Sequence, residues 1–233
     1  MDSVNEPFTL SAARTRALDR MAADFVRVFH DRFVALVAYA PADAVAFAAS
    51  ITAADLAALG PLAEAWHRDG LATPLVLTPD EFRRSLDAFP LEYSAILARH
   101  VLIAGRDPFA GMHVDPQDVR RACEVQAKGH LIHLRQGWLD ASGHDDRLAE
   151  LIADSAASLR VLLTELARLD RAGDGRDPAA WAETHAGLDA GLIRAVLDLE
   201  QDPDRAGQLV PRLPEYLSAA ERLWALADSW RRS

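Results

Sequence analysis

The hydrophobic pattern of this chain changes near Asp115, and that change limits the fold more than any other feature of the sequence. Before it, short apolar runs alternate with helix-like segments, which is typical of a small mixed sheet covered by helices. After it, apolar residues recur every three or four positions, which predicts amphipathic helices only. We therefore expect an α+β chain with two domains, residues 1–112 and residues 113–233.

The first domain predicts a mixed β-sheet with helices packed on it. Thr78, Pro79 and Glu81 form a helix-start signal, and Pro90 ends that helix because the residue before a proline avoids the helical region. The expected helices span residues 11–31, 52–70 and 80–88, with Pro61 bending or dividing the second, and the expected strands span 33–39, 44–50, 73–77, 91–93 and 101–104.

The second domain predicts an up-down bundle of four helices. Each expected helix carries one apolar stripe, and the connections between them contain glycine, proline or aspartate. The expected helices span residues 116–138, 148–169, 181–199 and 213–230, and the longest connection covers residues 202–212.

Composition and charge restrict the environment and the partners. The formal net charge of −10 argues against broad nucleic-acid binding, which needs clustered lysine and arginine. No apolar run reaches the roughly 18 residues of a membrane span, and the N-terminal residues lack the apolar core of a signal peptide. The single cysteine, Cys123, cannot form an internal disulfide, and its place on an apolar stripe predicts a buried, inert thiol. We expect a soluble, cytoplasmic protein.

Two histidines of the second domain, His130 and His133, stand three positions apart on one expected helix. Facing helices of a bundle can hold a metal ion, but the Glu-x-x-His pairs of such sites are missing here. Hydrogen-bonded or solvated histidines are therefore the favoured interpretation.

Three stretches of the chain carry a resemblance to a known family. They are PLVLTPDEFRRSLDAFPLEY (74–93), RHVLIAGRDPFAGMHVD (99–115) and RRACEVQAKGHLIHLRQGWL (120–139). Together with the order of elements, they resemble bacterial nucleotidyltransferase-domain proteins of the kanamycin-nucleotidyltransferase and minimal-nucleotidyltransferase type. The resemblance implies a small mixed sheet followed by a helical bundle.

The resemblance also implies where a catalytic site would lie. In that family a Gly-Ser turn opens a helix after the first strand, an Asp-x-Asp pair on the second strand binds Mg²⁺, and a later strand supplies a third carboxylate. Such carboxylates hold metal ions that orient and neutralise a polyphosphate. In this chain Asp43 matches the first acid, its partner position is Val45, and Glu92 matches the third acid, while the Gly-Ser pair is missing.

These departures favour a catalytically degenerate protein that acts through binding or assembly, with the bundle as the surface for a protein partner or for homo-oligomer formation. The alternative is an active enzyme that transfers a nucleotide from ATP with Mg²⁺, using Asp43 and Glu92 as metal ligands. In that case Tyr39 and Pro41 would line the nucleotide cleft together with the two acids. A cleft filled by Tyr39 or Pro41 would count against the enzyme. A helical partner of a toxin–antitoxin type is a third possibility by family analogy.

Overall fold

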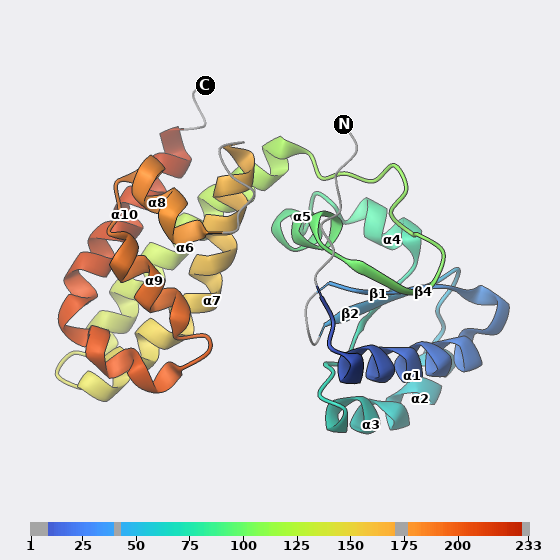
Figure 1. Cartoon of the computed structure of the whole chain (residues 1–233). Helices are drawn as coiled ribbons and strands as arrows, with labels where there is room; N and C mark the ends of the chain where they lie inside the picture. Colours follow the sequence, from blue (N-terminus) through green and yellow to red (C-terminus); the bar gives the residue numbers. More distant parts are fainter. Residues whose placement is uncertain (1–8, 40–42, 171–176, 230–233) are drawn as a thin grey trace. The chain divides into compact units, whose positions relative to one another are not determined.

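The computed structural model describes residues 9–39, 43–170 and 177–229 (Figure 1). The chain divides into two compact units, Met1–Asp115 and Pro116–Ser233, which we call the α/β unit and the helical unit. The division lies at Asp115, three residues beyond the boundary expected from the sequence. Each unit is described by itself below.

The α/β unit is a four-stranded mixed sheet with helices on both faces. Its helices are α1 (Ala12–Phe29), α2 (Ala53–Leu59), α3 (Ala63–Arg68), α4 (Pro79–Arg84) and α5 (Pro90–Ala98), with short 3-10 segments η1 (His30–Arg32) and η2 (Gly60–Leu62). Its strands are β1 (Phe33–Ala38), β2 (Ala44–Ala48), β3 (Leu75–Leu77) and β4 (Val101–Gly105).

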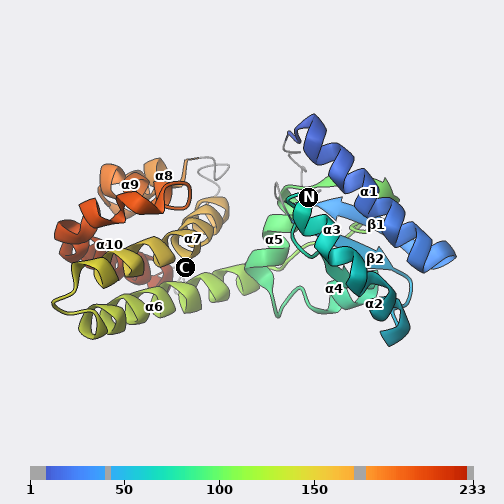
Figure 2. The same ribbon diagram turned by 90° about the horizontal axis from the view of Figure 1, so that it is seen from below.

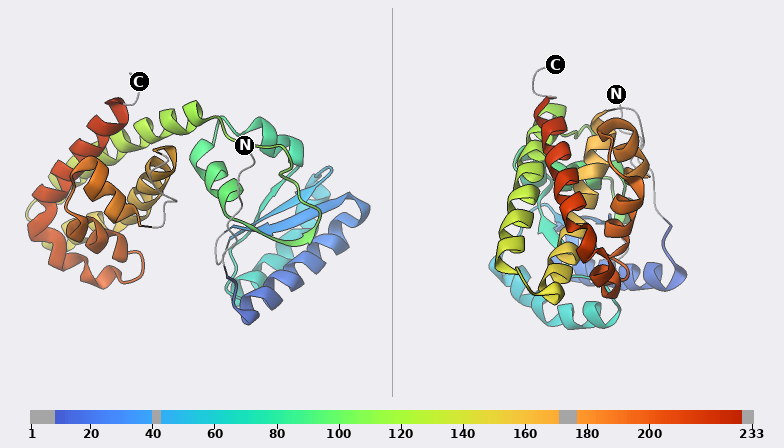
Figure 3. Two further views of the ribbon diagram at one scale, coloured as in Figure 1. Left: turned by 45° about the horizontal axis from the view of Figure 1, so that its top comes forward. Right: turned by 90° about the vertical axis from the view of Figure 1, so that its left-hand side faces the viewer.

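The strand order is β3-β2-β1-β4, so β1 and β2 form the centre of the sheet. β1 pairs antiparallel with both β2 and β4, and β2 pairs parallel with β3. Both central strands are covered on both faces, so β2 is buried throughout its length and β1 is buried at every residue except Phe33. The helices α1, α2 and α3 lie on one face of the sheet, and α4 and α5 lie on the other (Figures 1 and 3).

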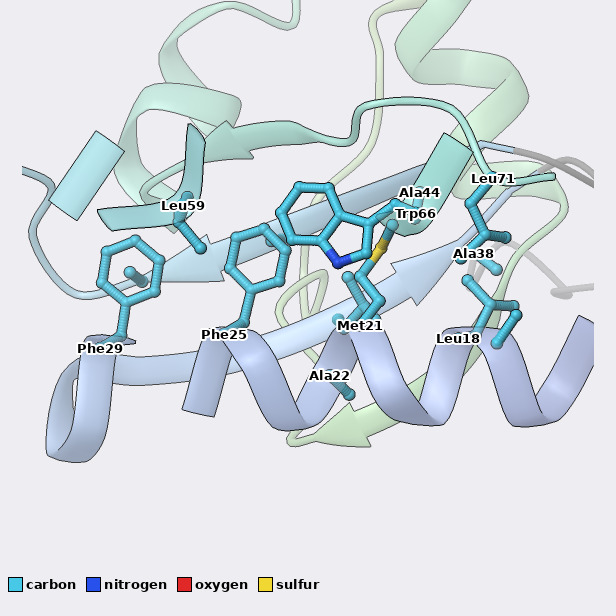
Figure 4. Packing of buried hydrophobic residues seen from close by; sticks show 14 residues of the cluster. Leu18, Met21, Ala22, Phe25, Phe29, Ala38, Ala44, Leu59, Trp66 and Leu71 are labelled. Carbon is cyan, nitrogen blue, oxygen red and sulfur yellow. The ribbon is translucent and has the colours of Figure 1, made fainter. Parts of the chain in front are cut away.

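Small strand residues on one face are matched by large helix residues. Ala44, Ala46 and Ala48 of β2 all point toward α1, which fills the space with aromatic rings. Figure 4 shows Phe25 of α1 stacked against Trp66 of α3, with ring centroids 5.5 Å apart. Alanine has low strand propensity, and this packing explains why an alanine-rich strand is stable here.

One expected strand is wrong. Residues 91–93 lie in α5, which begins at Pro90, so the sheet of the described residues has four strands and not five. Proline fits the first position of a helix, and Tyr93, Ile96 and Leu97 then recur at helical spacing on the buried side. Residues 91–93 are too few to distinguish the side-chain repeat of a strand from that of a helix.

The helical unit contains α6 (Pro116–Asp140), α7 (Asp145–Leu169), α8 (Pro178–Ala186), α9 (Ala190–Asp198), the 3-10 segment η3 (Pro203–Arg212) and α10 (Leu213–Ser229). Figure 2 shows α6 and α7 as two long neighbouring helices. The single helix expected over residues 181–199 is divided into α8 and α9, so the prediction of a bundle of four continuous helices is wrong. Gly187 adopts a φ of +62° that ends α8, and the carboxylate of Asp189 accepts from Leu192 N at 3.1 Å to start α9.

Candidate functional site

The site expected from the family resemblance centres on the connection between β1 and β2. Tyr39 follows β1 and Asp43 precedes β2, and Tyr39 N donates to Asp43 O at 3.1 Å across the connection. Pro41 lies outside the described residues. The connection from Tyr39 to Asp43 joins two strands that pair directly, since Ala38 faces Ala44. Of the residues described between the strands, neither Tyr39 nor Asp43 belongs to a helix whose N-terminus could bind a phosphate.

The structure gives the positions of the acids that the resemblance would use as metal ligands. The position two residues after Asp43 is Val45, whose side chain is 0% exposed in the core. Glu92, expected on a strand, lies instead on the exposed side of the first turn of α5. In the described ranges no group of three His, Cys, Asp or Glu side chains could hold a metal ion.

Tyr39 nevertheless lies near both Asp43 and Tyr93. Burial raises the pKa of Tyr39, and the nearby charges of Asp43 and Tyr93 raise it further. Burial also raises the pKa of Tyr93, with a smaller contribution from Glu92. The ring of Tyr93 stacks on Phe82 with the centroids 4.1 Å apart. Tyr39 thus packs against the apolar cluster that contains Tyr93 and lies near Asp43, and both phenols have a raised pKa.

A pocket in the helical unit offers a different candidate site. It lies between α6 and α7 and has a volume of about 370 Å³, which is within the range of small-molecule sites. Gly129, His130 and His133 line it from α6, and Asp154, Ser155 and Ser158 line it from α7, with Leu134 and Leu151 adding apolar wall. Gly129 opens this space, because no atom lies within 4 Å of the position that a Cβ would occupy.

A hydrogen-bond network forms the polar wall of the pocket. His130 Nε2 lies 2.9 Å from the hydroxyl of Tyr216 on α10, and that hydroxyl lies 2.8 Å from Ser155 Oγ. On its other side, His130 Nδ1 lies 3.3 Å from Ser158 Oγ. The network therefore joins three helices, and it fixes the orientation of a histidine that is only 7% exposed.

The network is neutral at physiological pH. Burial, with a smaller contribution from the nearby His133, lowers the pKa of His130 to about 4. Burial raises the pKa of Tyr216 above its usual range, although the hydrogen bond with Ser155 opposes this shift. His130 is thus an uncharged imidazole at pH 7, able to accept or donate a hydrogen bond but carrying no charge.

Sequence reasoning found part of this pocket. It singled out His130 and His133 and favoured hydrogen-bonded or solvated side chains; the structure gives His130 hydrogen bonds and leaves His133 exposed. It missed Ser155, Ser158 and Tyr216. The two serines interrupt the apolar stripe of α7 between Ile152 and Leu159, and polar residues inside such a stripe are the signal that could have identified them.

Cys123 is no part of a reactive site. Its side chain is completely buried in α6, and burial raises its pKa to about 12, with a further contribution from Glu165. A thiol is a poor nucleophile when its thiolate is this strongly disfavoured, so the predicted inert cysteine is confirmed.

Comparisons with known proteins do not identify a relative. No protein-family model, no curated protein and no solved structure matches this chain. Over the described residues, none of the helices combines the length and apolar character needed to cross a lipid bilayer.

Proposed function

We propose that this chain is a non-catalytic binding protein built on a nucleotidyltransferase-like scaffold. The observation that carries the proposal is the direct antiparallel pairing of β1 with β2 across the short Tyr39–Asp43 connection. Transfer of a nucleotide needs backbone amides or cations that hold the polyphosphate in place. A strand-to-strand hairpin supplies neither a helix N-terminus nor a glycine-rich loop at this position.

The distribution of carboxylates supports the same proposal. Mg²⁺-dependent nucleotidyl transfer uses acidic ligands that converge on the metal ions from several directions. Asp43 has the buried Val45 in place of a second acid, and Glu92 stands on the outer side of α5. A single acid beside the half-buried Tyr39 makes a weak metal site.

The alternative is an active nucleotidyltransferase that uses ATP and Mg²⁺ with Asp43 and Glu92 as ligands. The observation in its favour is that Tyr39 lies near Asp43 and also near Tyr93, which follows Glu92 in the chain. An active enzyme of this kind would have to bind the nucleotide without the Gly-Ser turn of the family.

Isothermal titration of the folded protein with ATP and GTP, with and without Mg²⁺, separates the two. The binding-protein proposal expects no heat of nucleotide binding at concentrations up to about 1 mM. Metal-dependent binding in the micromolar range that is lost in Asp43→Ala and in Glu92→Ala would overturn it. Asp80→Ala serves as the matched control, because Asp80 is an exposed first-turn acid of α4.

An exposed apolar stripe on α6 supports a role in assembly. Val125, Ile132 and Leu139 are 66%, 51% and 78% exposed, and they stand seven residues apart on one side of the helix. That spacing is the repeat by which two helices pack along a seam. We propose that this stripe packs against the same stripe of a second copy.

Sedimentation velocity over a range of protein concentrations tests the assembly. A concentration-dependent dimer that Ile132→Glu abolishes and that the control Val161→Glu, at an exposed apolar position of α7, leaves intact is the expected result. A monomer at all concentrations would leave no role for the stripe in self-association and would refute this part of the proposal.

A further inference from the structure

We propose that the pocket between α6 and α7 binds a small molecule that combines an apolar body with a hydrogen-bond donor, either an amine or a hydroxyl, and that the donor bonds to His130 Nδ1. This inference deepens the binding role proposed above by naming its ligand class. Only the biological role of the ligand rests on the proposed function. Binding of the ligand does not, because the pocket belongs entirely to the helical unit.

The direction of each hydrogen bond in the network follows from the number of protons available. Ser155 Oγ donates to Ile152 O at 2.7 Å, so its proton is already in use. Tyr216 must therefore donate its single hydroxyl proton to Ser155 Oγ, which accepts. The oxygen of Tyr216 is then left to accept from His130, which assigns the proton of the neutral imidazole to Nε2.

The remaining ring nitrogen, Nδ1, then carries a lone pair. Its neighbour in the structure is Ser158 Oγ at 3.3 Å, but Ser158 donates its proton to Ser155 O at 2.9 Å. A hydroxyl has one proton, and the shorter contact has the better length for a hydrogen bond. His130 Nδ1 and Ser158 Oγ are thus two neighbouring acceptors in the pocket wall, and a ligand donor would satisfy them.

The charges around the pocket favour an amine or a hydroxyl over an anion. Neither lysine nor arginine lines it, and the one carboxylate in its wall belongs to the exposed Asp154 at the rim. A protonated amine would be attracted by Asp154, and a hydroxyl would be tolerated. A carboxylate ligand would be repelled by Asp154 and would meet acceptors where it needs donors.

The remaining wall supports an apolar body of moderate size. Leu134 and Leu151 contribute aliphatic surface, and the bare backbone at Gly129 leaves room for a flat ring. A volume of about 370 Å³ accepts a bicyclic aromatic group with a short side chain. A ligand of this size with about a dozen heavy atoms should bind with a dissociation constant on the order of 1 mM.

Three probes with one body test the donor requirement: tryptamine, tryptophol and indole-3-acetate. Each is titrated at pH 7 into the ¹⁵N-labelled full chain, and binding is followed by the amide shifts of α6 and α7. The expected result is binding of the amine or the alcohol at least tenfold tighter than the acid. Equal binding of the acid, or no binding of any probe at 10 mM, would overturn the proposal.

The ring nitrogens of His130 give a direct second measurement. Their ¹⁵N shifts in the free protein should show a neutral ring with the proton on Nε2, and the Nδ1 shift should change when tryptamine or tryptophol binds. A free protein with the proton on Nδ1 would refute the assignment of the acceptor, whether or not a probe binds.

Matched leucine variants test the location. Gly129→Leu places a side chain in the pocket and should weaken binding at least tenfold, while Gln136→Leu adds the same side chain at an exposed position of α6 outside it and should change affinity less than twofold. Equal affinity in Gly129→Leu and wild type would place the ligand elsewhere and overturn the proposal.

The two proposals fail separately in these experiments. Nucleotide binding to the α/β unit would shift amides near Asp43 and refute the non-catalytic role, without touching the pocket of the helical unit. Failure of all three indole probes would refute the ligand class and leave the nucleotide titration as it stands.

Discussion

Buried His130 should make the helical unit unstable in mild acid. The pKa of its imidazole is 6.5 in an unfolded chain and about 4 in the folded protein, because burial opposes the charged form. Below pH 6.5 the unfolded state therefore binds a proton that the folded state does not. The contribution of His130 to stability is complete above pH 6.5 and is lost as the pH falls from 6.5 toward 4.

The size of the effect follows from the two pKa values. Each pH step between them changes the free energy of unfolding by about 1.4 kcal/mol, so the full loss approaches roughly 3 kcal/mol, and the loss from pH 7 to pH 5 is about 2 kcal/mol. Several groups face the imidazole. Asp154, Ser155 and Ser158 line the pocket from α7, Tyr216 approaches from α10, and His133 is on the same helix.

The variant His130→Gln isolates this contribution from that of the carboxylates. Glutamine keeps a side-chain nitrogen that can donate toward Tyr216, and it carries no titratable proton. Urea unfolding of wild type and variant at pH 7 and pH 5, followed by amide signals of the helical unit, gives the four free energies. Wild type should lose about 2 kcal/mol more than the variant between the two pH values.

Equal losses in the two proteins would refute the reasoning. In that case the acid sensitivity would belong to other groups, and His130 would not be held neutral by burial. Tyr216→Phe gives a further check. It removes the acceptor of His130 Nε2 and should destabilise the unit at pH 7 by about 1–3 kcal/mol, because a buried donor is left unpaired.

Other predictions concern single residues of both units. Gly105→Ala should destabilise the α/β unit by at least about 2 kcal/mol in urea unfolding, because φ is +89° and the new Cβ would lie 2.1 Å from Val34 O. A change in the free energy of unfolding below about 0.5 kcal/mol would contradict this. Gly129→Ala should stabilise the helical unit by about 0.5–1 kcal/mol in the same assay, since the Cβ of the new alanine would meet no atom within 4 Å. A destabilised variant would show that the space beside Gly129 is not open. Arg32 holds the pKa of Asp55 well below its usual range, so the stability that this ion pair contributes is lost as the pH falls through and below that usual range. Asp55→Asn should therefore lower the melting temperature at pH 7 and lessen the decline of the melting temperature in acid. Parallel pH profiles of variant and wild type would rule this out.

The helix starts could be read from the sequence because they depend on contacts within one turn. Ser11 and Thr78 accept hydrogen bonds from backbone amides three residues later, as their positions before apolar stripes predict. The division of the second helix at Pro61 is confirmed for the same reason, since proline removes a donor of its own turn. The central strands β1 and β2 were also found, because each is an apolar run between clear breaks.

Contacts between residues farther apart in the chain determine features that the sequence pattern leaves open. Residues 91–93 fit the side-chain repeat of a strand as well as that of a helix, and the packing of Tyr93 on Phe82 favours the helix. Gly187, by contrast, ends α8 through a local turn in which its N–H and that of Leu188 donate to carbonyls of α8 itself, although the apolar stripe continues past it.

The two candidate sites show the same contrast. The missing Gly-Ser pair and Val45, two positions after Asp43, are visible in the sequence, so the hypothesis of a degenerate catalytic site depends on residues a few positions apart. The pocket of the helical unit was not predictable in this way, because Tyr216 bonds to Ser155 and to His130 across 61 and 86 residues. Local sequence sets caps, breaks and periods through contacts along the chain, but the neighbours of a buried polar group depend on how three helices pack together, and only the tertiary structure fixes that packing.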